Sequence, residues 1–208
     1  DGVGYLKGYK HLFVVPSEGG TARQLTEGRF NFASYRGGQT VWSKDSKYIY
    51  VSTNLEDDWE AEGYRQSDIY QVNANDGKMD KLTDRDGPDG NPTPSPDGKS
   101  LAYTGFDNKK MATQISHMYV MNLKTRKIRE IKTKLDRGVS NISWSGDSKS
   151  IIFNYADKGN TKLAQTTLKG KNNILTNNLG RSYSLTTDGR FVFITTRPDL
   201  PSDLAVGK

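Results

Sequence analysis

The chain has 208 residues, of which 33% are hydrophobic, and it contains no cysteine. Disulfide bonds and thiol catalysis are therefore excluded, and no run of about 18 apolar residues that could cross a membrane is present. The first residues lack the charged and then apolar pattern of a signal peptide. We expect no membrane association, and we favour the cytoplasm slightly over the periplasm.

One sequence pattern recurs four times along the chain. Each copy consists of a polar turn that contains an aspartate and a strand that follows it. Along the strand, large apolar residues alternate with smaller ones, as Leu101 and Tyr103 alternate with Ala102 and Thr104. The shared aspartates are Asp45, Asp97, Asp147 and Asp188. A period of roughly 40–50 residues with several short strands per unit is typical of β-propeller blades.

In chain order, the pattern predicts an all-β fold, a β-propeller of four-stranded antiparallel blades within a single, partial propeller domain. The blades are expected at about 11–26 (a half blade), 38–83, 91–133 and 140–176, followed by an incomplete blade at 183–206 whose third strand is Asp203-Leu-Ala-Val206. Three blades are thus complete and two are partial. Either the two partial blades pair as a composite fourth blade, or the chain is an open piece of a larger propeller whose edges invite self-association.

The repeated aspartates have two interpretations. They could serve as metal ligands or as acid and base groups, or they could be four copies of one turn residue. We favour the turn, because aspartate and glycine are the residues that such turns select. His11 and His117 occupy equivalent positions in two repeats, which indicates packing and not catalysis.

The long connections are expected to leave the blades on one side, where function usually resides. They are the segments 54–67 and 106–116 and the interblade links 27–39, 84–91, 134–139 and 177–182. One link, Asp84-Arg-Asp-Gly-Pro-Asp-Gly90, superficially resembles a calcium loop, but its carboxylate spacing is wrong for an EF-hand. We predict no catalytic residues, no metal and no cofactor in this chain.

A net charge of +6 raises the question of nucleic-acid binding. The densest basic stretch, from Lys124 to Arg137, fits better as an outer edge strand that uses lysine and arginine to avoid pairing with other sheets. No aromatic residues interleave with it as a base-stacking platform would require. We therefore expect no nucleic-acid partner.

At this point the sequence resembles a known group, the N-terminal propellers of acylaminoacyl-peptidase and dipeptidyl-aminopeptidase-type members of the prolyl oligopeptidase family. The likeness covers nearly the whole chain, although TolB-like and WD40-like propellers share part of the repeat. It is carried by Asp1-Gly-Val-Gly-Tyr-Leu6, His11-Leu-Phe-Val-Val15, Gln24-Leu-Thr26, Ser67-Asp-Ile-Tyr70, Arg85-Asp-Gly-Pro-Asp89, Pro94-Ser-Pro-Asp-Gly98 and Leu135-Asp-Arg-Gly-Val139. The chain departs from the repeat at Ser46 and Ser148, which replace the turn glycine, at Pro94 and Thr186, which replace tryptophan, and at Lys44, which replaces proline.

The resemblance implies a serine hydrolase in which a propeller covers a separate α/β-hydrolase domain, gates the access of short peptides and helps to bind them. The catalytic residues of such a hydrolase would all lie outside this chain. Candidates for contact with substrate or with the hydrolase domain are Arg36, Asp136, Arg137, Arg181 and Tyr183. The alternative is a stand-alone TolB-like scaffold for a protein partner.

Overall fold

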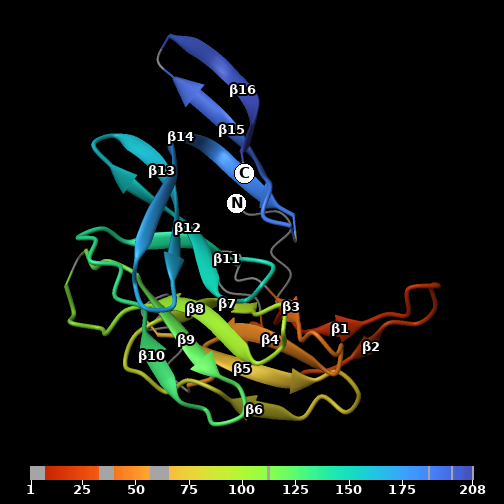
Figure 1. Ribbon diagram of the computed structural model, residues 1–208. Helices are drawn as coiled ribbons and strands as arrows, with labels where there is room; N and C mark the ends of the chain where they lie inside the picture. Colours follow the sequence, from red (N-terminus) through yellow and green to blue (C-terminus); the bar gives the residue numbers. More distant parts are fainter. Residues whose placement is uncertain are drawn as a thin grey trace, which may run out of the picture. The chain divides into compact units, whose positions relative to one another are not determined.

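The computed structural model describes residues 8–32, 40–56, 66–111, 113–186, 188–197 and 199–207 (Figure 1). All regular structure among these residues is β-strand. The chain divides into two compact units, Asp1–Pro92 and Thr93–Lys208, and the strand β7 (Asp89–Pro94) contains the boundary between them.

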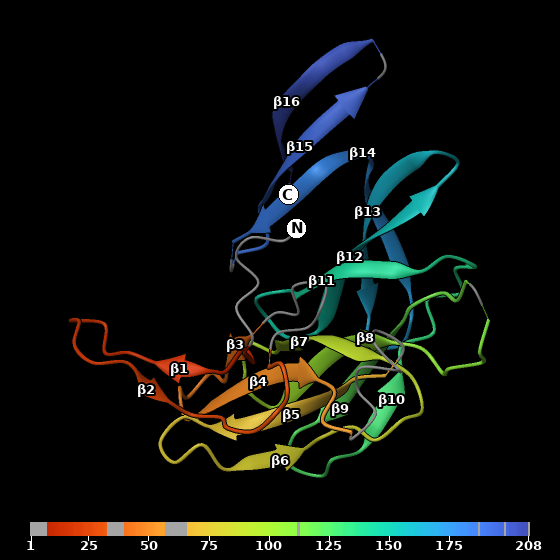
Figure 2. The same ribbon diagram turned by 180° about the vertical axis from the view of Figure 1, so that it is seen from behind.

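The first unit holds a hairpin and a four-stranded antiparallel sheet (Figure 2). The hairpin pairs Phe13 with Gln24. The sheet has the order β3-β4-β5-β6, so each strand pairs with its neighbour in the sequence. The bounds are β1 (Phe13–Val14), β2 (Arg23–Gln24), β3 (Val41–Trp42), β4 (Tyr48–Thr53), β5 (Asp68–Asn73) and β6 (Met79–Lys81).

Strand β7 leads into the second four-stranded sheet, which has the order β10-β9-β8-β7. Its other strands are β8 (Ser100–Gly105), β9 (His117–Asn122) and β10 (Ile128–Glu130). Strand β10 lies at the edge of this sheet and all three of its residues are exposed. An edge strand is therefore present within the stretch from Lys124 to Arg137, but it holds only one basic residue, Arg129, and the other lysines and arginines lie in the turn before it and the link after it.

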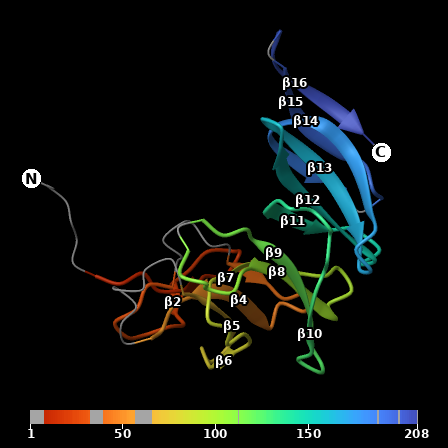
Figure 3. The same cartoon turned by 90° about the vertical axis from the view of Figure 1, so that its left-hand side faces the viewer.

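The rest of the second unit forms one antiparallel sheet of six strands (Figure 3). Its strands follow the sequence order: β11 (Val139–Trp144), β12 (Ser150–Asp157), β13 (Asn160–Thr167), β14 (Asn172–Leu185), β15 (Phe191–Arg197) and β16 (Leu200–Gly207). The predicted strand at 203–206 is present within β16.

The expected link at residues 177–182 is wrong, because β14 runs straight through it. Leu179 pairs with Thr161 on one side and with Thr195 on the other. Residues 177–182 contain no proline, so each of them keeps its backbone N–H. Nothing in the local sequence therefore removes a ladder donor and stops the strand.

The core lies between stacked faces within each unit. In the first unit, Leu12 and Val14 of the hairpin segment pack on a cluster that includes Ile49 and Val72. In the second unit, a larger cluster joins the two sheets; its members are Ala102, Met118, Val120, Ile131, Val139, Ile142, Trp144, Ile151, Phe153, Tyr155 and Ala164. Ala102 of β8 belongs to this cluster, and Leu101, Tyr103 and Thr104 of the same strand are buried as well.

The repeated aspartates are turn residues, as predicted. The Ser43 hydroxyl donates to Asp45 Oδ1 at 2.7 Å, and the Lys47 N–H donates to the same oxygen at 3.3 Å. These bonds hold the pKa of Asp45 below its ordinary value, chiefly through the Ser43 hydroxyl. The same pair of bonds, from a hydroxyl and from a backbone N–H, recurs at Asp97, Asp147 and Asp188.

The residue after each of these aspartates adopts a left-handed backbone, which favours glycine. Ser46 has a φ of 57° and Ser148 a φ of 59°. We expect Ser46→Gly to raise the free energy of unfolding by about 0.5–1 kcal/mol in urea denaturation, because it relieves this strain. Ser148→Gly should gain less, since the Ser148 hydroxyl accepts the Asp97 N–H at 3.1 Å. An equal or larger gain at Ser148 would contradict this account.

Trp144 ties β11 to the preceding sheet. Its indole Nε1 donates to the Thr93 carbonyl at 2.8 Å, and the side chain is buried. We expect Trp144→Phe to lower the free energy of unfolding by about 2 kcal/mol, because it removes a hydrogen bond and leaves a gap. Trp42 occupies the corresponding place in the first unit but is 49% exposed, so Trp42→Phe is the control and should change stability by less than about 0.5 kcal/mol.

Candidate functional site

The long connections of each unit leave its sheets at one end. In an antiparallel sheet in sequence order, β4 and β6 end at the same edge of the first four-stranded sheet, and β8 and β10 end at the same edge of the second. We call this edge of each unit its long-loop side. It carries the described parts of the segments 54–67 and 106–116 and the links 82–88 and 131–138.

The link that contains Asp136 and Arg137 is anchored at its base. Leu135 packs against the larger core cluster, and the Val139 N–H donates to the Ser116 carbonyl at 3.0 Å. Gly138 lies so close to the neighbouring segment that a Cβ there would sit 3.3 Å from Ser116 N. This close approach fixes where the two preceding side chains emerge.

Asp136 and Arg137 form an exposed ion pair. Arg137 Nη1 lies 2.7 Å from Asp136 Oδ2 and 3.0 Å from the Asp136 carbonyl oxygen. The Asp136 side chain is 86% exposed and that of Arg137 is 44% exposed. Both groups are therefore available to a partner, and the pair itself adds little to stability.

A second ion pair lies on the same side of the second unit. Lys162 Nζ lies 2.7 Å from Asp157 Oδ2. Lys162 holds the pKa of Asp157 below its ordinary value, and the charges of Lys158 and Arg137 act in the same direction. Arg137 is thus close enough to Asp157 to influence it electrostatically, which places the Asp136–Arg137 pair beside the β12–β13 turn.

Tyr183 uses its hydroxyl inside the second unit. The hydroxyl donates to the Asn141 carbonyl and lies 3.3 Å from the Ile152 carbonyl oxygen. Burial raises the pKa of Tyr183 to about 12, so the phenol stays neutral. Its ring packs with the small cluster of Ile152, Leu163 and Phe191. Arg36 and the side chain of Arg181 lie outside the described residues, although the backbone of Arg181 belongs to β14.

The heads of the third strands in the repeats are equivalent, as the sequence predicts for His11 and His117. The Leu25 N–H donates to the Leu12 carbonyl, and the Ile131 N–H donates to the Met118 carbonyl, both at 2.8 Å. Each head residue has a polar partner: His11 contacts Thr26, His117 contacts Glu130 at 3.1 Å, and Asp68 contacts Lys81 at 2.8 Å. These positions therefore have a polar partner whether they hold histidine or aspartate.

A buried group of charges in the first unit was not found by sequence reasoning. Asp68 and Asp89 are 2% and 1% exposed, and Asp89 accepts a hydrogen bond from Arg85. Asp89 belongs to the stretch that superficially resembles a calcium loop. Its carboxylate is engaged by an arginine within that stretch, while Asp84 and Asp86 are exposed. Among the described residues, no group of three or more potential metal ligands comes together.

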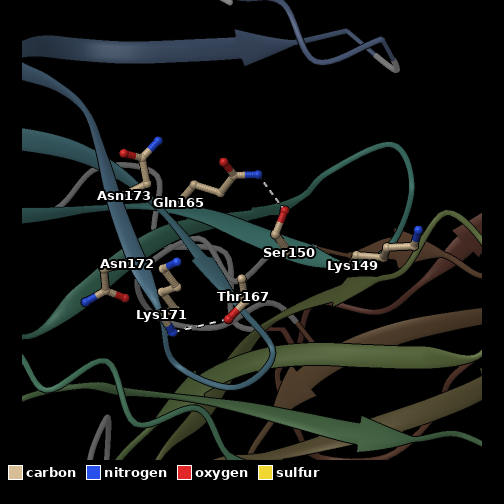
Figure 4. Close-up of a pocket in the computed structure, with 7 residues that line it drawn as sticks. All are labelled: Lys149, Ser150, Gln165, Thr167, Lys171, Asn172 and Asn173. Carbon is tan, nitrogen blue, oxygen red and sulfur yellow. Dashed lines mark hydrogen bonds between the residues drawn. The ribbon is translucent and has the colours of Figure 1, made fainter.

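A hollow with a volume of about 290 Å³ lies in the second unit beside the β13–β14 turn (Figure 4). It is lined by Lys149, Ser150, Gln165, Thr167 and Lys171, together with two asparagines. Gln165 already donates to the Ser150 hydroxyl at 2.6 Å. Small-molecule sites are usually larger and mostly apolar, so this hollow does not have the character of one.

The described residues contain no helix with the length and apolarity of a membrane span. No protein-family model matches the chain. Among curated proteins, dipeptidyl-peptidase 5 of Porphyromonas gingivalis is 30% identical over 129 residues, which are 62% of this chain. The chain covers only 19% of the length of that relative.

Solved structures that match nearly the whole chain include a TolB protein and an acylaminoacyl peptidase. TolB from Acinetobacter baumannii matches 94% of this chain and 45% of its own, with a TM-score of 0.66 and 21% identity. The acylaminoacyl peptidase of Pyrococcus horikoshii matches 93% of this chain and 28% of its own, with a TM-score of 0.64 and 17% identity. The chain has a β-propeller fold. At these identities the two structures establish the fold alone, and the predicted all-β propeller class is confirmed.

The structural neighbours of this propeller include TolB and the propeller-bearing peptidases that the sequence motifs indicated. The division into one half blade, three complete blades and one incomplete blade stays a prediction. The six-stranded sheet shows that the last two predicted blades share the strand β14.

Proposed function

We propose that this chain is the propeller portion of a serine peptidase of the prolyl oligopeptidase family. In this proposal it covers a separate α/β-hydrolase domain, admits short peptides and helps to bind them. The observation that carries the proposal is the 30% identity to dipeptidyl-peptidase 5 over 129 residues. The propeller likeness to an acylaminoacyl peptidase and the matched motif Leu135-Asp-Arg-Gly-Val139 support it.

Such a cover would contribute to the reaction by excluding other molecules from the hydrolytic site. A propeller over a hydrolytic site keeps large folded substrates away and limits the access of water. The exposed Asp136–Arg137 pair, set on an anchored link of the long-loop side, is our first candidate for contact with the peptide or with the hydrolase domain. Arg36, Arg181 and Tyr183 remain further candidates for the same contact.

The test uses the complete polypeptide that contains this chain. A fluorophosphonate probe should label the complete polypeptide and leave the isolated chain unlabelled, because the nucleophilic serine belongs to the other domain. Removal of residues 1–208 should allow hydrolysis of long peptides that the complete protein rejects. Absence of labelling of the complete polypeptide would overturn the proposal.

The role of Arg137 is tested by Arg137→Ala in the complete polypeptide. We expect kcat/KM for short peptides to fall about tenfold, which corresponds to about 1.4 kcal/mol of lost binding. Lys124→Ala is the matched control, because Lys124 is an exposed basic residue in the β9–β10 turn on the opposite side of the unit. Equal effects of the two variants would remove Arg137 from the contact surface.

The match to TolB over 94% of the chain favours a second candidate, a stand-alone scaffold for a protein partner. The two functions differ in the downstream coding sequence. A hydrolase segment with a G-x-S-x-G nucleophile motif supports the peptidase, whereas a stop soon after residue 208 supports the scaffold.

A further inference from the structure

A buried carboxyl lies where the link 84–88 enters β7. Asp89 accepts a hydrogen bond from Arg85 through Oδ1, and the side chain is 1% exposed. Its other oxygen, Oδ2, is buried and has no partner at hydrogen-bond distance among the described residues, although the Thr83 hydroxyl is near enough to act on the carboxyl. An ionised carboxylate with one oxygen left in this state is unfavourable, because that oxygen loses its water without a replacement.

The link itself is held by neutral hydrogen bonds. Gln66 spans it: its Oε1 accepts the Gly87 N–H at 2.7 Å, and its Nε2 donates to the Arg85 carbonyl at 3.1 Å. The Asp89 N–H donates to the Ser67 carbonyl at 2.8 Å. The Asp89 carbonyl accepts the hydroxyls of Ser52 at 2.6 Å and Ser67 at 3.0 Å. None of these groups gains or loses a proton in the ordinary pH range, so the ionisation of the Asp89 side chain is what can make the stability of the link depend on pH.

The charged groups around Asp89 come from three further elements. Arg85 stands in the link, Asp68 heads β5, and Lys81 ends β6 with its Nζ 2.8 Å from Asp68 Oδ2. Glu56, which follows β4, lies 3.5 Å from Lys81. Burial raises the pKa of Asp89 to about 6. The positive charge and the hydrogen bond of Arg85 oppose this rise, as does the Thr83 hydroxyl, and the negative charge of Asp68 adds to it.

We propose that Asp89 is a proton-operated clasp: its protonated side chain holds the link 84–88 closed on the first unit, and its ionised form loosens the link. The closed state surrounds the carboxyl with protein and keeps its proton, whereas an opened link returns the carboxyl to water, where it ionises readily. By linkage, the state that binds the proton more tightly is favoured as pH falls. The long-loop side of the first unit therefore tightens in acid and loosens toward neutral pH.

The test is amide hydrogen exchange of the whole chain at a series of pH values, corrected for the intrinsic exchange rates. We expect the protection of the Gly87 and Asp89 amides to fall by about 100-fold between pH 4 and pH 6.5 and then to level off. The Ile131 amide, which donates to the Met118 carbonyl in the second unit, is the reference and should show no such fall. Protection at Gly87 and Asp89 that does not change with pH would overturn the proposal.

Two variants assign the effect. Asp89→Asn cannot ionise and should remove the pH dependence, whereas Asp86→Asn removes an exposed carboxyl of the same link and should keep it. If Asp89→Asn does not fold, carbon-13 titration of the wild-type carboxyls decides. A midpoint above about pH 5 for Asp89 supports the clasp, and a midpoint at or below about pH 5 refutes it.

Discussion

Replacement of Gly77 by alanine is expected to lower the free energy of unfolding by about 3 kcal/mol or more. Gly77 has a φ of +74°, and a Cβ at this position would lie 2.2 Å from the backbone oxygen of Leu25. The left-handed backbone alone costs an alanine about 1–2 kcal/mol, and the overlap with a backbone atom adds a packing cost of similar size. Leu25 cannot move away freely, because its N–H is bound to the Leu12 carbonyl.

Urea denaturation of Gly77→Ala and Gly159→Ala separates the cost of the left-handed backbone from the cost of the overlap with Leu25. Gly159 has a φ of +79° but nothing within 4 Å of its added Cβ, so its variant should lose only about 1 kcal/mol. Gly170→Ala is an independent repeat in the second unit, since its Cβ would lie 2.3 Å from the Lys132 oxygen. If Gly77→Ala loses no more stability than Gly159→Ala, the close approach is not a constraint on the fold.

These close approaches explain why a glycine recurs before the fourth strand. Gly77 and Gly170 each bring their turn against the segment that ends the preceding repeat. The corresponding turn after β9 has Arg126, whose φ of 59° shows that the left-handed backbone is kept there without glycine. The turn conformation itself therefore tolerates a side chain. Glycine is required at Gly77 and Gly170 because a Cβ there would overlap the segment that ends the preceding repeat.

The features that could be predicted from the sequence are those encoded within a few residues. The turn around Asp97 depends only on a serine hydroxyl and a backbone N–H two residues away, so this turn and its repetition can be predicted from the sequence. The burial of Asp89 cannot be predicted from the sequence, because it depends on contacts of its link with Ser52 and Gln66. These two residues are distant in the sequence and belong to other elements. A charged residue in a glycine- and proline-rich link has the composition of an exposed loop.

The same distinction applies to β14 and to the candidate residues. The sequence repeats predict a link at 177–182, but pairing with β13 and β15 continues the strand, and such pairing is a long-range effect. The sequence predicts Tyr183 to be an aromatic residue on the long-loop side, and in the structure its hydroxyl bonds to the backbone at Asn141, where β11 and β12 shift register. The Asp136–Arg137 pair was found through its motif, and its exposure keeps it available for contact.

The second large effect is on the pH dependence of stability. Because the pKa of Asp89 is raised to about 6 from its ordinary value of 3.8, the folded protein binds more protons than the unfolded chain between these two values. The contribution of Asp89 to the free energy of unfolding therefore falls as pH rises from about 4 to about 6, by about 3 kcal/mol in total, and is constant above that range. Asp45, Asp147 and Asp188 have lowered pKa values and act with the opposite sign at lower pH.

The difference between wild type and Asp89→Asn isolates this contribution, since the other carboxyls are common to both proteins. In urea denaturation at several pH values, the stability of the wild type relative to the variant should decline between pH 4 and pH 6 and then run parallel to it. Asp86→Asn should give a difference that is flat across the range, because that carboxyl is exposed. A wild type that gains stability over Asp89→Asn as pH rises would show that the Arg85 ion pair outweighs the burial of the carboxylate, and the sign of the clasp would then be reversed.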